Sequence, residues 1–374
     1  MNVQSGNDTD NQRIPWAKPY FWGDEKRLVE EALGSTWISG GPFVEKLEAH
    51  FREHLSVPHG LLVSNGTSAL HLAYLALGLG PGDEIILPGF GFLAAANLAL
   101  HVGAQPVFAE VDPDTWLVSA GQIEDCLTPR TRAIVVIHTY GNVCDMDDIL
   151  GFAKSHAIPV IEDAAEALGS CYGSRAAGTM GDIGTYSFQA TKTITTGEGG
   201  LVVTRHQALA EKMALYRSHG LQRRTHYWHD LPGHNFRLTN LQAALGYAQV
   251  QHWEDIKRER RRISESYTKC LQGVEGIVPQ YFTGAVDPVV WAVAVRLLPE
   301  FFSRSRDQIM DTLHTAGIET RPGFFPASLH PYFNTAPLPM CEALSRQIIS
   351  LPAFIGLDDE QIAYVVQTLA GLRG

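Results

Sequence analysis

The sequence has few cysteines, and this scarcity excludes two classes of protein. Its 374 residues include five cysteines, an odd number, and no two of them form a CxxC pair. A disulfide framework or a cysteine-based zinc site would need paired or closely spaced cysteines, and no other pattern indicates a metal site. Scattered, reduced thiols are typical of the cytoplasm, where we expect the protein to be located. The cysteines are Cys126, Cys144, Cys171, Cys270 and Cys341.

The sequence also lacks an excess of positive charge and a long apolar run. Its formal net charge of −11 argues against binding to nucleic acids, which requires a basic surface. One basic run, KRERRR at 257–262, has acidic neighbours and is expected to be a solvated helix face. The apolar stretch at 61–77 is interrupted by Ser, Asn and Gly, so it is too short to span a membrane. The polar residues 1–13 predict neither a signal peptide nor an anchor.

The first two thirds of the chain alternate between apolar strands and helices. This alternation is typical of βαβ units, in which helices cover both faces of a mainly parallel sheet. It predicts an α/β fold. The expected strands are 60–65, 84–88, 105–112, 131–141 and 159–166, and the expected helices are 24–35, 41–55, 67–79, 92–103 and 146–157.

The character of the sequence changes after about residue 240. Residues 238–271 read as one long helix that connects two domains. A strand at 291–298, a helix at 306–317, a proline-rich loop at 319–333 and a closing helix at 358–372 follow it. We therefore predict a large domain over residues 1–250, including an N-terminal arm, and a smaller C-terminal α/β domain over 251–374.

Lys192 lies between two strand-like runs, TYSF at 185–188 and GLVVT at 200–204, beside a cluster of glycines. A lone lysine in such a turn is most often an exposed charge. The alternative is an amine held in a pocket, where it could form a Schiff base with a carbonyl compound. The remaining motifs decide between the two interpretations.

Two further motifs admit both a structural and a functional interpretation. In SNGTSAL, at 64–70, a strand turns into a helix whose N-terminal N–H groups and hydroxyls could bind a phosphate, although Thr67 or Ser68 could simply cap the helix. Asp163 ends an apolar strand, at the edge where open α/β sheets bind ligands. A buried carboxylate there requires a cationic partner, but Asp163 could also be a helix cap.

The third motif is GFGFLAAANLAL, at 89–100, whose Phe90 and Phe92 follow a predicted strand. An aromatic face at that position could stack on a planar cofactor, although core packing is the more common role of a phenylalanine. Taken together with Ser187 and Lys192, the three motifs form the pattern of a fold-type I enzyme that uses pyridoxal phosphate (PLP). In such an enzyme Lys192 is the catalytic amine.

The sequence resembles the DegT/DnrJ/EryC1/StrS family of sugar aminotransferases from residue 37 to the last helix. The motifs that carry the resemblance are NGTSALHLA, IEDAAEALGS, SFQATKTITTGEGG and GHNFRLTNLQAA. The resemblance implies a large domain like that of aspartate aminotransferase with a mainly parallel sheet, a smaller C-terminal α/β domain, PLP as cofactor and L-glutamate as amino donor. KTITTGEGG and GIETRPGFFP are most similar to the GDP-perosamine synthase branch, which aminates the C4 ketone of a 4-keto-6-deoxy sugar nucleotide.

The resemblance also assigns roles to individual residues. Lys192 would bind PLP covalently and move protons, and Asp163 would pair with the pyridine nitrogen. The other cofactor contacts implied are Glu166 at the ring hydroxyl, Phe92 stacked on the ring, and Gly66, Thr67 and Ser187 at the phosphate. Asn235, with Arg237 close by, would reach the phosphate of the neighbouring subunit, which implies a homodimer with shared active sites. Arg321 and His330 would contact the substrate.

The sequence departs from the family in the residues directly before the lysine. These residues are FQAT, at 188–191, and Gln189 among them resembles what the branch that acts on keto-cyclitols has at this position. Amination of a keto-cyclitol or of a C3-ketosugar therefore stays open as an alternative. A non-catalytic regulator is a third interpretation, but such a protein would not need the complete set of lysine, aspartate and phosphate loop.

Overall fold

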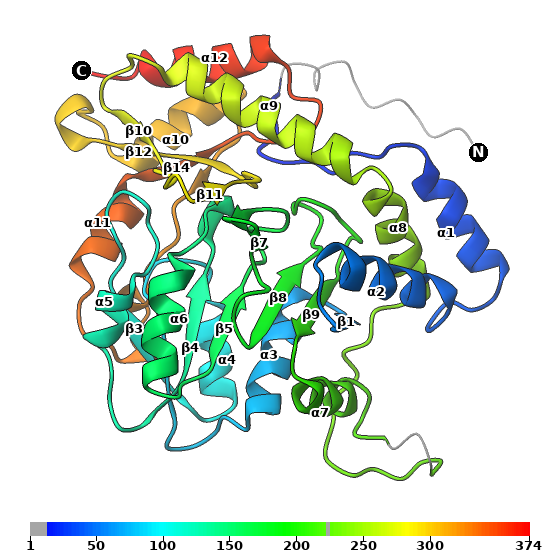
Figure 1. Ribbon diagram of the computed structural model, residues 1–374. Helices are drawn as coiled ribbons and strands as arrows, with labels where there is room; N and C mark the ends of the chain where they lie inside the picture. The colour runs from blue at the N-terminus through cyan, green and yellow to red at the C-terminus, as the bar shows by residue number, and fades with distance from the viewer. Residues whose placement is uncertain (1–12, 222–224) are drawn as a thin grey trace.

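The computed structural model describes residues 13–221 and 225–374 of the chain (Figure 1). Almost all of the polar N-terminal segment, for which we predicted neither a signal peptide nor an anchor, lies outside these ranges. None of the helices in the described ranges is both long enough and apolar enough to cross a membrane.

The large sheet has seven strands, in the order β1-β9-β8-β5-β4-β2-β3. β9 is antiparallel to both of its neighbours, and every other adjacent pair is parallel. The mainly parallel sheet of the sequence prediction is therefore confirmed. The strands are β1 (His59–Val63), β2 (Glu84–Pro88), β3 (Gln105–Ala109), β4 (Thr131–Ile137), β5 (Val160–Asp163), β8 (Ile183–Ser187) and β9 (Gly200–Thr204).

Helices cover both faces of this sheet, which is why its strands are apolar on both sides. In β4, Ile134 and Val136 belong to one core and Val135 to the other. The first core is closed by α1 (Asp24–Gly34), α2 (Pro42–His54), α5 (Ala120–Glu124), α6 (Met146–Ser155) and α8 (Asn240–Val250). The second is closed by α3 (Gly66–Leu77), α4 (Ala94–His101), α7 (Gln207–Arg217) and α11 (Pro339–Gln347).

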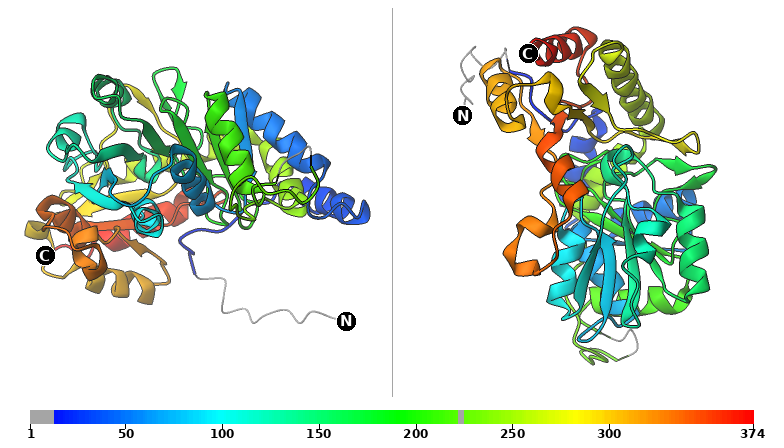
Figure 2. Two further views of the ribbon diagram at one scale, coloured as in Figure 1. Left: turned by 90° about the horizontal axis from the view of Figure 1, so that it is seen from below. Right: turned by 90° about the vertical axis from the view of Figure 1, so that its left-hand side faces the viewer.

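A smaller antiparallel sheet lies at one end of the large one (Figures 1 and 2). Its order is β10 (Ile277–Pro279), β12 (Val293–Leu297), β14 (Ile348–Leu351) and β13 (Arg321–Pro322). α9 (Trp253–Leu271), α10 (Arg306–Thr315) and α12 (Asp359–Ala370) share its core. Ile14 of the N-terminal arm pairs with Ile318 and packs in this core. A third, three-stranded sheet joins β11 (Val286–Asp287), β6 (Cys171–Tyr172) and β7 (Arg175–Ala176).

The prediction of one helix over 238–271 is wrong, because the chain breaks at residues 251–252 between α8 and α9. α8 packs against α1 and α2, whereas α9 packs against α12, so the chain must change direction between these surfaces. The His252 ring stacks on Trp22 at the break, with centroids 5.0 Å apart. Hydrophobic periodicity does not reveal this turn because both helices carry apolar faces.

The basic run on α9 is only partly the solvated face that we predicted. Lys257, Arg258 and Arg262 form ion pairs with acidic residues one turn away on α9. Arg260 is buried instead, and its guanidinium donates to the carbonyl oxygens of Trp291 and Ala353, at 3.0 and 2.9 Å. The arginine therefore ties α9 to the residues just before β12 and to the loop that follows β14.

Candidate active site

A cavity of about 690 Å³ lies where β4, β5 and β8 end, between the large sheet and the small one. The last residues of these three strands, Ile137, Asp163 and Ser187, all line it. Parallel strands present their carboxyl ends at the same edge, so residues far apart in the sequence meet there. Nine of the eleven predicted site residues line the cavity: Gly66, Thr67, Phe92, Asp163, Glu166, Ser187, Lys192, Arg321 and His330.

Asp163 is a buried carboxylate with few partners. Its side chain is 5% exposed, and its single hydrogen bond within the described chain comes from the Ala165 N–H at 3.1 Å. Burial raises the pKa of Asp163 to about 6, and the nearby Glu166 carboxylate adds to this. No helix follows β5 directly, so the helix-cap interpretation of Asp163 is wrong.

Lys192 lies in the connection between β8 and β9, as the sequence predicted. Its side chain is largely buried rather than exposed, and its Nζ lies 3.5 Å from Glu166 Oε1. Burial lowers the pKa of Lys192, while Glu166 and Asp163 counteract this effect. Gly197, with φ of 80°, permits the turn that returns the chain to β9.

Glu166 is positioned by a strained residue in the turn that follows β4. Tyr140 has φ of 62°, an uncommon value for a residue with a side chain, and its N–H donates to Glu166 Oε2 at 2.9 Å. Glu166 is therefore held between Tyr140 and Lys192. Strained backbone of this kind is concentrated at functional sites.

The N-terminus of α3 forms one end of the cavity. Asn65 is the cap, because its side chain accepts the Ser68 N–H at 2.8 Å, so neither Thr67 nor Ser68 caps the helix. The exposed Thr67 and its neighbour Gly66 line the cavity. A Cβ on Gly66 would lie 3.0 Å from that of Ser187, so glycine lets the helix start approach β8 closely. The positive end of a helix favours an anion at this position.

The two phenylalanines of GFGF have different environments. Phe90 is fully buried in the core, whereas Phe92 is 59% exposed and lines the cavity, with its ring 6.3 Å from that of Phe324. Of the two interpretations considered from the sequence, core packing applies to Phe90 and stacking on a planar ligand can apply to Phe92. Of these two phenylalanines, only Phe92 can present an aromatic face to a ligand.

The small sheet and the N-terminal arm form the opposite wall. Arg321, at the start of β13, pairs with Glu319 at 2.5 Å and lies 5.4 Å from the Trp16 ring centroid. Trp16 donates its indole N–H to Ser350 at 2.9 Å, which fixes the arm against β14. His330, in the loop that follows β13, completes this wall.

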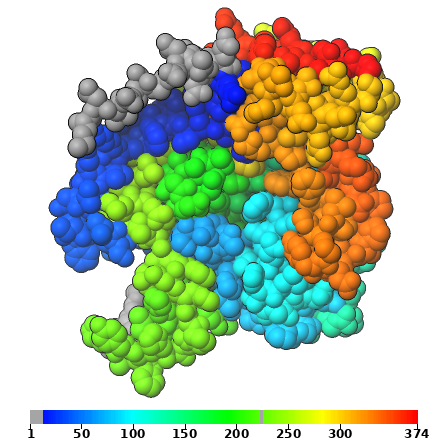
Figure 3. Space-filling model, turned by 180° about the vertical axis from the view of Figure 1, so that it is seen from behind, coloured from blue at the N-terminus to red at the C-terminus, as the bar shows by residue number. Residues whose placement is uncertain are grey.

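Asn235 and Arg237 do not line the cavity of their own chain. They lie in the segment between α7 and α8, which projects from the body of the molecule (Figure 3). Arg237 pairs with Val63 at the end of β1, and both predicted side chains are exposed. The intervening Phe236 points the other way and packs against His71. Alternation along an extended segment therefore turns Asn235 and Arg237 to the same outer side.

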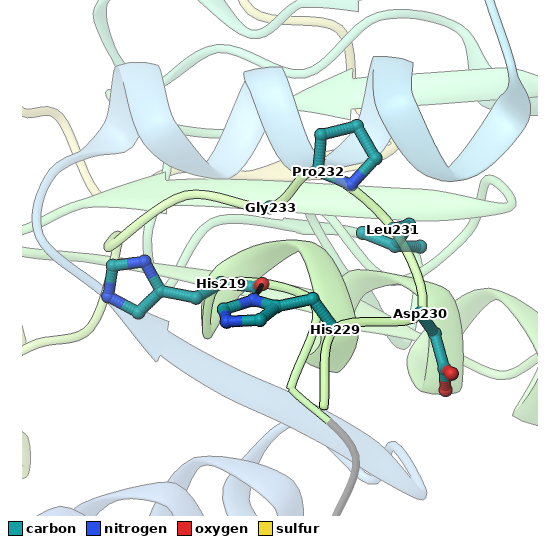
Figure 4. A pocket seen from close by; sticks show the side chains of 6 residues that line it. All are labelled: His219, His229, Asp230, Leu231, Pro232 and Gly233. Atoms are coloured by element: carbon teal, nitrogen blue, oxygen red, sulfur yellow. Dashed lines mark hydrogen bonds between the residues drawn. The ribbon is translucent and has the colours of Figure 1, made fainter. Parts of the chain in front are cut away.

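The projecting segment contains a shallow pocket of its own, formed by residues 219 and 229–233 (Figure 4). The His229 ring is hydrogen-bonded to the His219 carbonyl oxygen at 2.7 Å, which joins the two arms of the segment. Tyr227, in the same segment, is 90% exposed. Tyr227, Asn235 and Arg237 are thus all exposed in the projecting segment, and none of them lines the cavity.

Sequence reasoning missed the aromatic residues of the cavity wall. Tyr140 follows β4 at its carboxyl end, in IHTYG, so the rule that identified Asp163 could have identified it. Trp16, Trp291 and Phe324 come from the arm and the small domain. No local motif distinguishes these three from ordinary core residues.

The residues of the cavity fit pyridoxal phosphate. A buried carboxylate with one hydrogen bond is suited to a protonated ring nitrogen, and a buried lysine of lowered pKa is suited to an aldehyde. The helix N-terminus beside Ser187 is suited to a phosphate. The fold and the site together define an aminotransferase-like PLP enzyme of fold type I.

The chain matches the DegT/DnrJ/EryC1/StrS aminotransferase family over residues 21–370 and belongs to it. It is 40% identical over 366 residues to GDP-perosamine synthase from Caulobacter vibrioides, with 96% of this chain and 98% of that protein covered. The crystal structure of the aminotransferase TlmJ from Streptoalloteichus hindustanus superposes with a TM-score of 0.91 at 31% identity, covering 96% and 98% of the two chains. The PLP form of Spr1654 from Streptococcus pneumoniae gives 0.91 at 26% identity, covering 96% and 98%. The predictions of a sugar aminotransferase and of its cofactor are confirmed.

Proposed function

We propose that the enzyme transfers an amino group from L-glutamate to a ketosugar nucleotide, at C4 of a 4-keto-6-deoxy sugar. The observation that carries the proposal is the cavity in which a buried lysine, two buried carboxylates and a helix N-terminus meet. The likeness to GDP-perosamine synthase along nearly the whole chain supports amination at C4.

The cofactor would be held from its phosphate to its ring by the large domain. The N–H groups at the start of α3 and the hydroxyls of Thr67 and Ser187 would bind the phosphate. Phe92 would stack on the ring and Glu166 would lie near its hydroxyl. When bound, PLP supplies an aldehyde carbon that accepts amines and a ring that withdraws electrons.

Asp163 and Lys192 would control the protons. Asp163 would hold a proton at the ring nitrogen, because a buried carboxylate with one neutral donor gains most from a cation. Lys192 would bind the cofactor between turnovers and, once released, would take up and return a proton at Nζ. Its lowered pKa suits an amine that must act as a base near neutral pH.

The substrate would contact the opposite wall of the cavity, where Arg321 and His330 are the predicted partners. Arg321 already balances its charge against Glu319. A nucleotide sugar carries two phosphates, so we expect the pair to separate or to share Arg321 when substrate binds.

Amination of a keto-cyclitol or of a C3-ketosugar is the second candidate, and Gln189 is the observation that favours it. Gln189 lines the cavity three residues before the lysine. Its Oε1 accepts hydrogen bonds from the Thr191 N–H and hydroxyl, at 2.8 and 2.7 Å. These bonds leave its amide NH₂ as a donor for a substrate hydroxyl.

A substrate panel in D₂O tests the proposal. The enzyme, PLP and glutamate are incubated with 4-keto sugar nucleotides, 3-keto sugar nucleotides and keto-cyclitols, and products are identified by mass spectrometry and NMR. We expect an amino sugar nucleotide with one deuterium at C4, because the proton at the aminated carbon comes from an exchangeable group. Deuterium at C3, or product only from cyclitols, would contradict the C4 assignment. Lys192→Ala is the matched control.

We place the reaction in the cytoplasm. All five cysteines are unpaired in the structure, including the buried Cys144 and Cys341. Free thiols that persist in this way are typical of a reducing compartment.

We further propose that two copies of the chain share their active sites. Asn235 and Arg237 face outward from a projecting segment that also exposes Tyr227, a surface suited to contact with a second copy. In a symmetric dimer the same patch would meet its own copy, and each pair would reach the phosphate of the partner's cofactor.

A mixing experiment tests the shared sites. Lys192→Ala is combined with the double variant Asn235→Ala, Arg237→Ala under conditions of proven subunit exchange. Each heterodimer would have one site with both lesions and one site with neither, so activity should return to about a quarter of the wild-type level if exchange is random. If no activity returns although subunit exchange is proven, Asn235 and Arg237 belong to the active site of their own chain or to no active site.

A further inference from the structure

Trp291 contacts the lysine at two places. It lies just before β12, is 7% exposed, and donates its indole N–H to the Thr191 carbonyl oxygen at 2.7 Å. The centre of its ring lies 3.6 Å from Lys192 Nζ. One side chain of the small domain thus holds both the backbone directly before the lysine and the amine at the end of its side chain.

Trp291 is itself held from three parts of the molecule, two of which contact its ring. It stacks on Tyr140 of the large domain, with centroids 6.4 Å apart and planes at 14°. Trp16 of the N-terminal arm meets it edge-on at 5.6 Å. The backbone carbonyl oxygen of Trp291 accepts a hydrogen bond from Arg260 of α9. The face that it presents to Lys192 therefore has a fixed position.

Lys192 needs such a partner because burial disfavours its charged form. The acidic groups that act on it are Glu166, 3.5 Å from Nζ, and Asp163. Glu198, Arg321 and His330 line the same cavity from the following turn and from the small domain, as does the Tyr140 ring. The negative face of an indole attracts an ammonium group, most strongly where water is excluded.

We propose that the Trp291 ring and the Glu166 carboxylate form a seat for the free Lys192 amine when that amine carries a proton. Trp291 is then a positioning residue, which favours the charged form of the amine and fixes it between the two groups. The importance of the seat in turnover rests on the proposed function, but the seat itself is a property of the cofactor-free protein.

Competitive labelling of the cofactor-free protein tests the seat. Lysine amines are acetylated with acetic anhydride between pH 6 and 11, and peptide mass spectrometry gives the apparent pKa of Lys192 relative to the exposed Lys26. Trp291→Leu should lower this pKa by roughly 0.5 to 1 unit, which is a roughly 3- to 10-fold rise in reactive amine below the pKa. Trp291→Phe keeps a ring face and should recover at least half of the shift.

Trp253→Leu is the control, because Trp253 is equally buried, at 6%, and packs on His54 rather than on the lysine. The seat is overturned if Trp291→Leu leaves the apparent pKa of Lys192 unchanged. It is also overturned if Trp291→Phe or Trp253→Leu lowers that pKa as much as Trp291→Leu does. Should Trp291→Leu not fold, fluorinated tryptophans at position 291 weaken the ring face at nearly constant shape. The pKa should then fall with each added fluorine, and a flat series overturns the seat. A shifted profile in a protein without transaminase activity supports the seat and contradicts only the proposed function.

Discussion

The two faces of β5 carry adjacent buried carboxylates with opposite surroundings. Glu162 points away from the cavity, and it accepts N–H groups of Gly178, Met180 and Gly181 and pairs with the His138 ring at 2.9 Å. Asp163 points into the cavity and has one N–H donor. Consecutive residues of a strand face opposite sides, so one step along the chain separates the two environments.

The difference distinguishes structural from chemical use of a buried charge. A carboxylate with every acceptor position filled has no capacity for a ligand, and its partners are what make its burial tolerable. A carboxylate that is buried with one partner is costly in the free protein, and a cationic ligand offsets that cost. We therefore infer that Glu162 stabilises the fold, and we propose that Asp163 pairs with the ring nitrogen of the cofactor.

The largest expected effect comes from removing the saturated carboxylate. Glu162→Ala should lower the free energy of unfolding by about 3 to 5 kcal/mol, because it leaves three N–H groups and a histidine without their acceptor. Denaturant unfolding measures the loss. Activity per folded molecule should remain within a few-fold of wild type. A stable but inactive Glu162→Ala protein would contradict the claim that Glu162 is structural and Asp163 chemical.

Asp163→Asn should show the reverse pattern. The amide keeps the shape of the side chain but cannot hold the ring nitrogen protonated, so we expect kcat to fall on the order of 10²-fold or more, about 3 kcal/mol of barrier. Stability at neutral pH should not fall. Glu162→Gln is the matched neutral variant one residue away. Near-normal turnover of Asp163→Asn, by steady-state kinetics with saturating PLP, would make Asp163 a structural residue.

The pH dependence of stability sharpens the comparison further. The pKa of Asp163 is raised from 3.8 to about 6, so the folded state retains a proton that the unfolded state has lost. Its contribution to stability is full below about pH 4 and is lost as pH rises through 6, by about 2 to 3 kcal/mol.

Relative to Asp163→Asn, the cofactor-free wild type should therefore lose stability between about pH 4 and pH 7, as thermal unfolding across this range will show. Saturation with PLP should cancel most of the difference. A constant difference between the two proteins across this range would mean that Asp163 keeps an ordinary pKa.

The sequence revealed Asp163 and Lys192 because strand ends and glycine-rich turns carry local signals. The position of Asp163 at the end of an apolar strand was sufficient to predict its place at the sheet edge. The role of Glu162 was not predictable in the same way, since its partners belong to a turn more than 15 residues away. The sequence alone could not distinguish two adjacent acidic residues by the number of their donors.

The small-domain side of the cavity was less predictable for the same reason. Trp291 contacts a lysine 99 residues earlier in the chain, and Trp16 lies at the cavity where the arm pairs with the residues just before Arg321. Such contacts depend on how the two domains meet. The burial of Arg260 within a basic run was equally hard to predict, because the carbonyl groups that accept its hydrogen bonds lie 31 and 93 residues away along the chain.

The most direct test of the account is to trap the cofactor on the protein. The purified enzyme with PLP is reduced with borohydride, digested and mapped by mass spectrometry. We predict one labelled peptide, which contains Lys192, and visible absorbance that disappears on reduction; Lys192→Ala should carry no label there. A label on another lysine, or a protein that stays colourless with PLP present, would contradict the assignment of the active site.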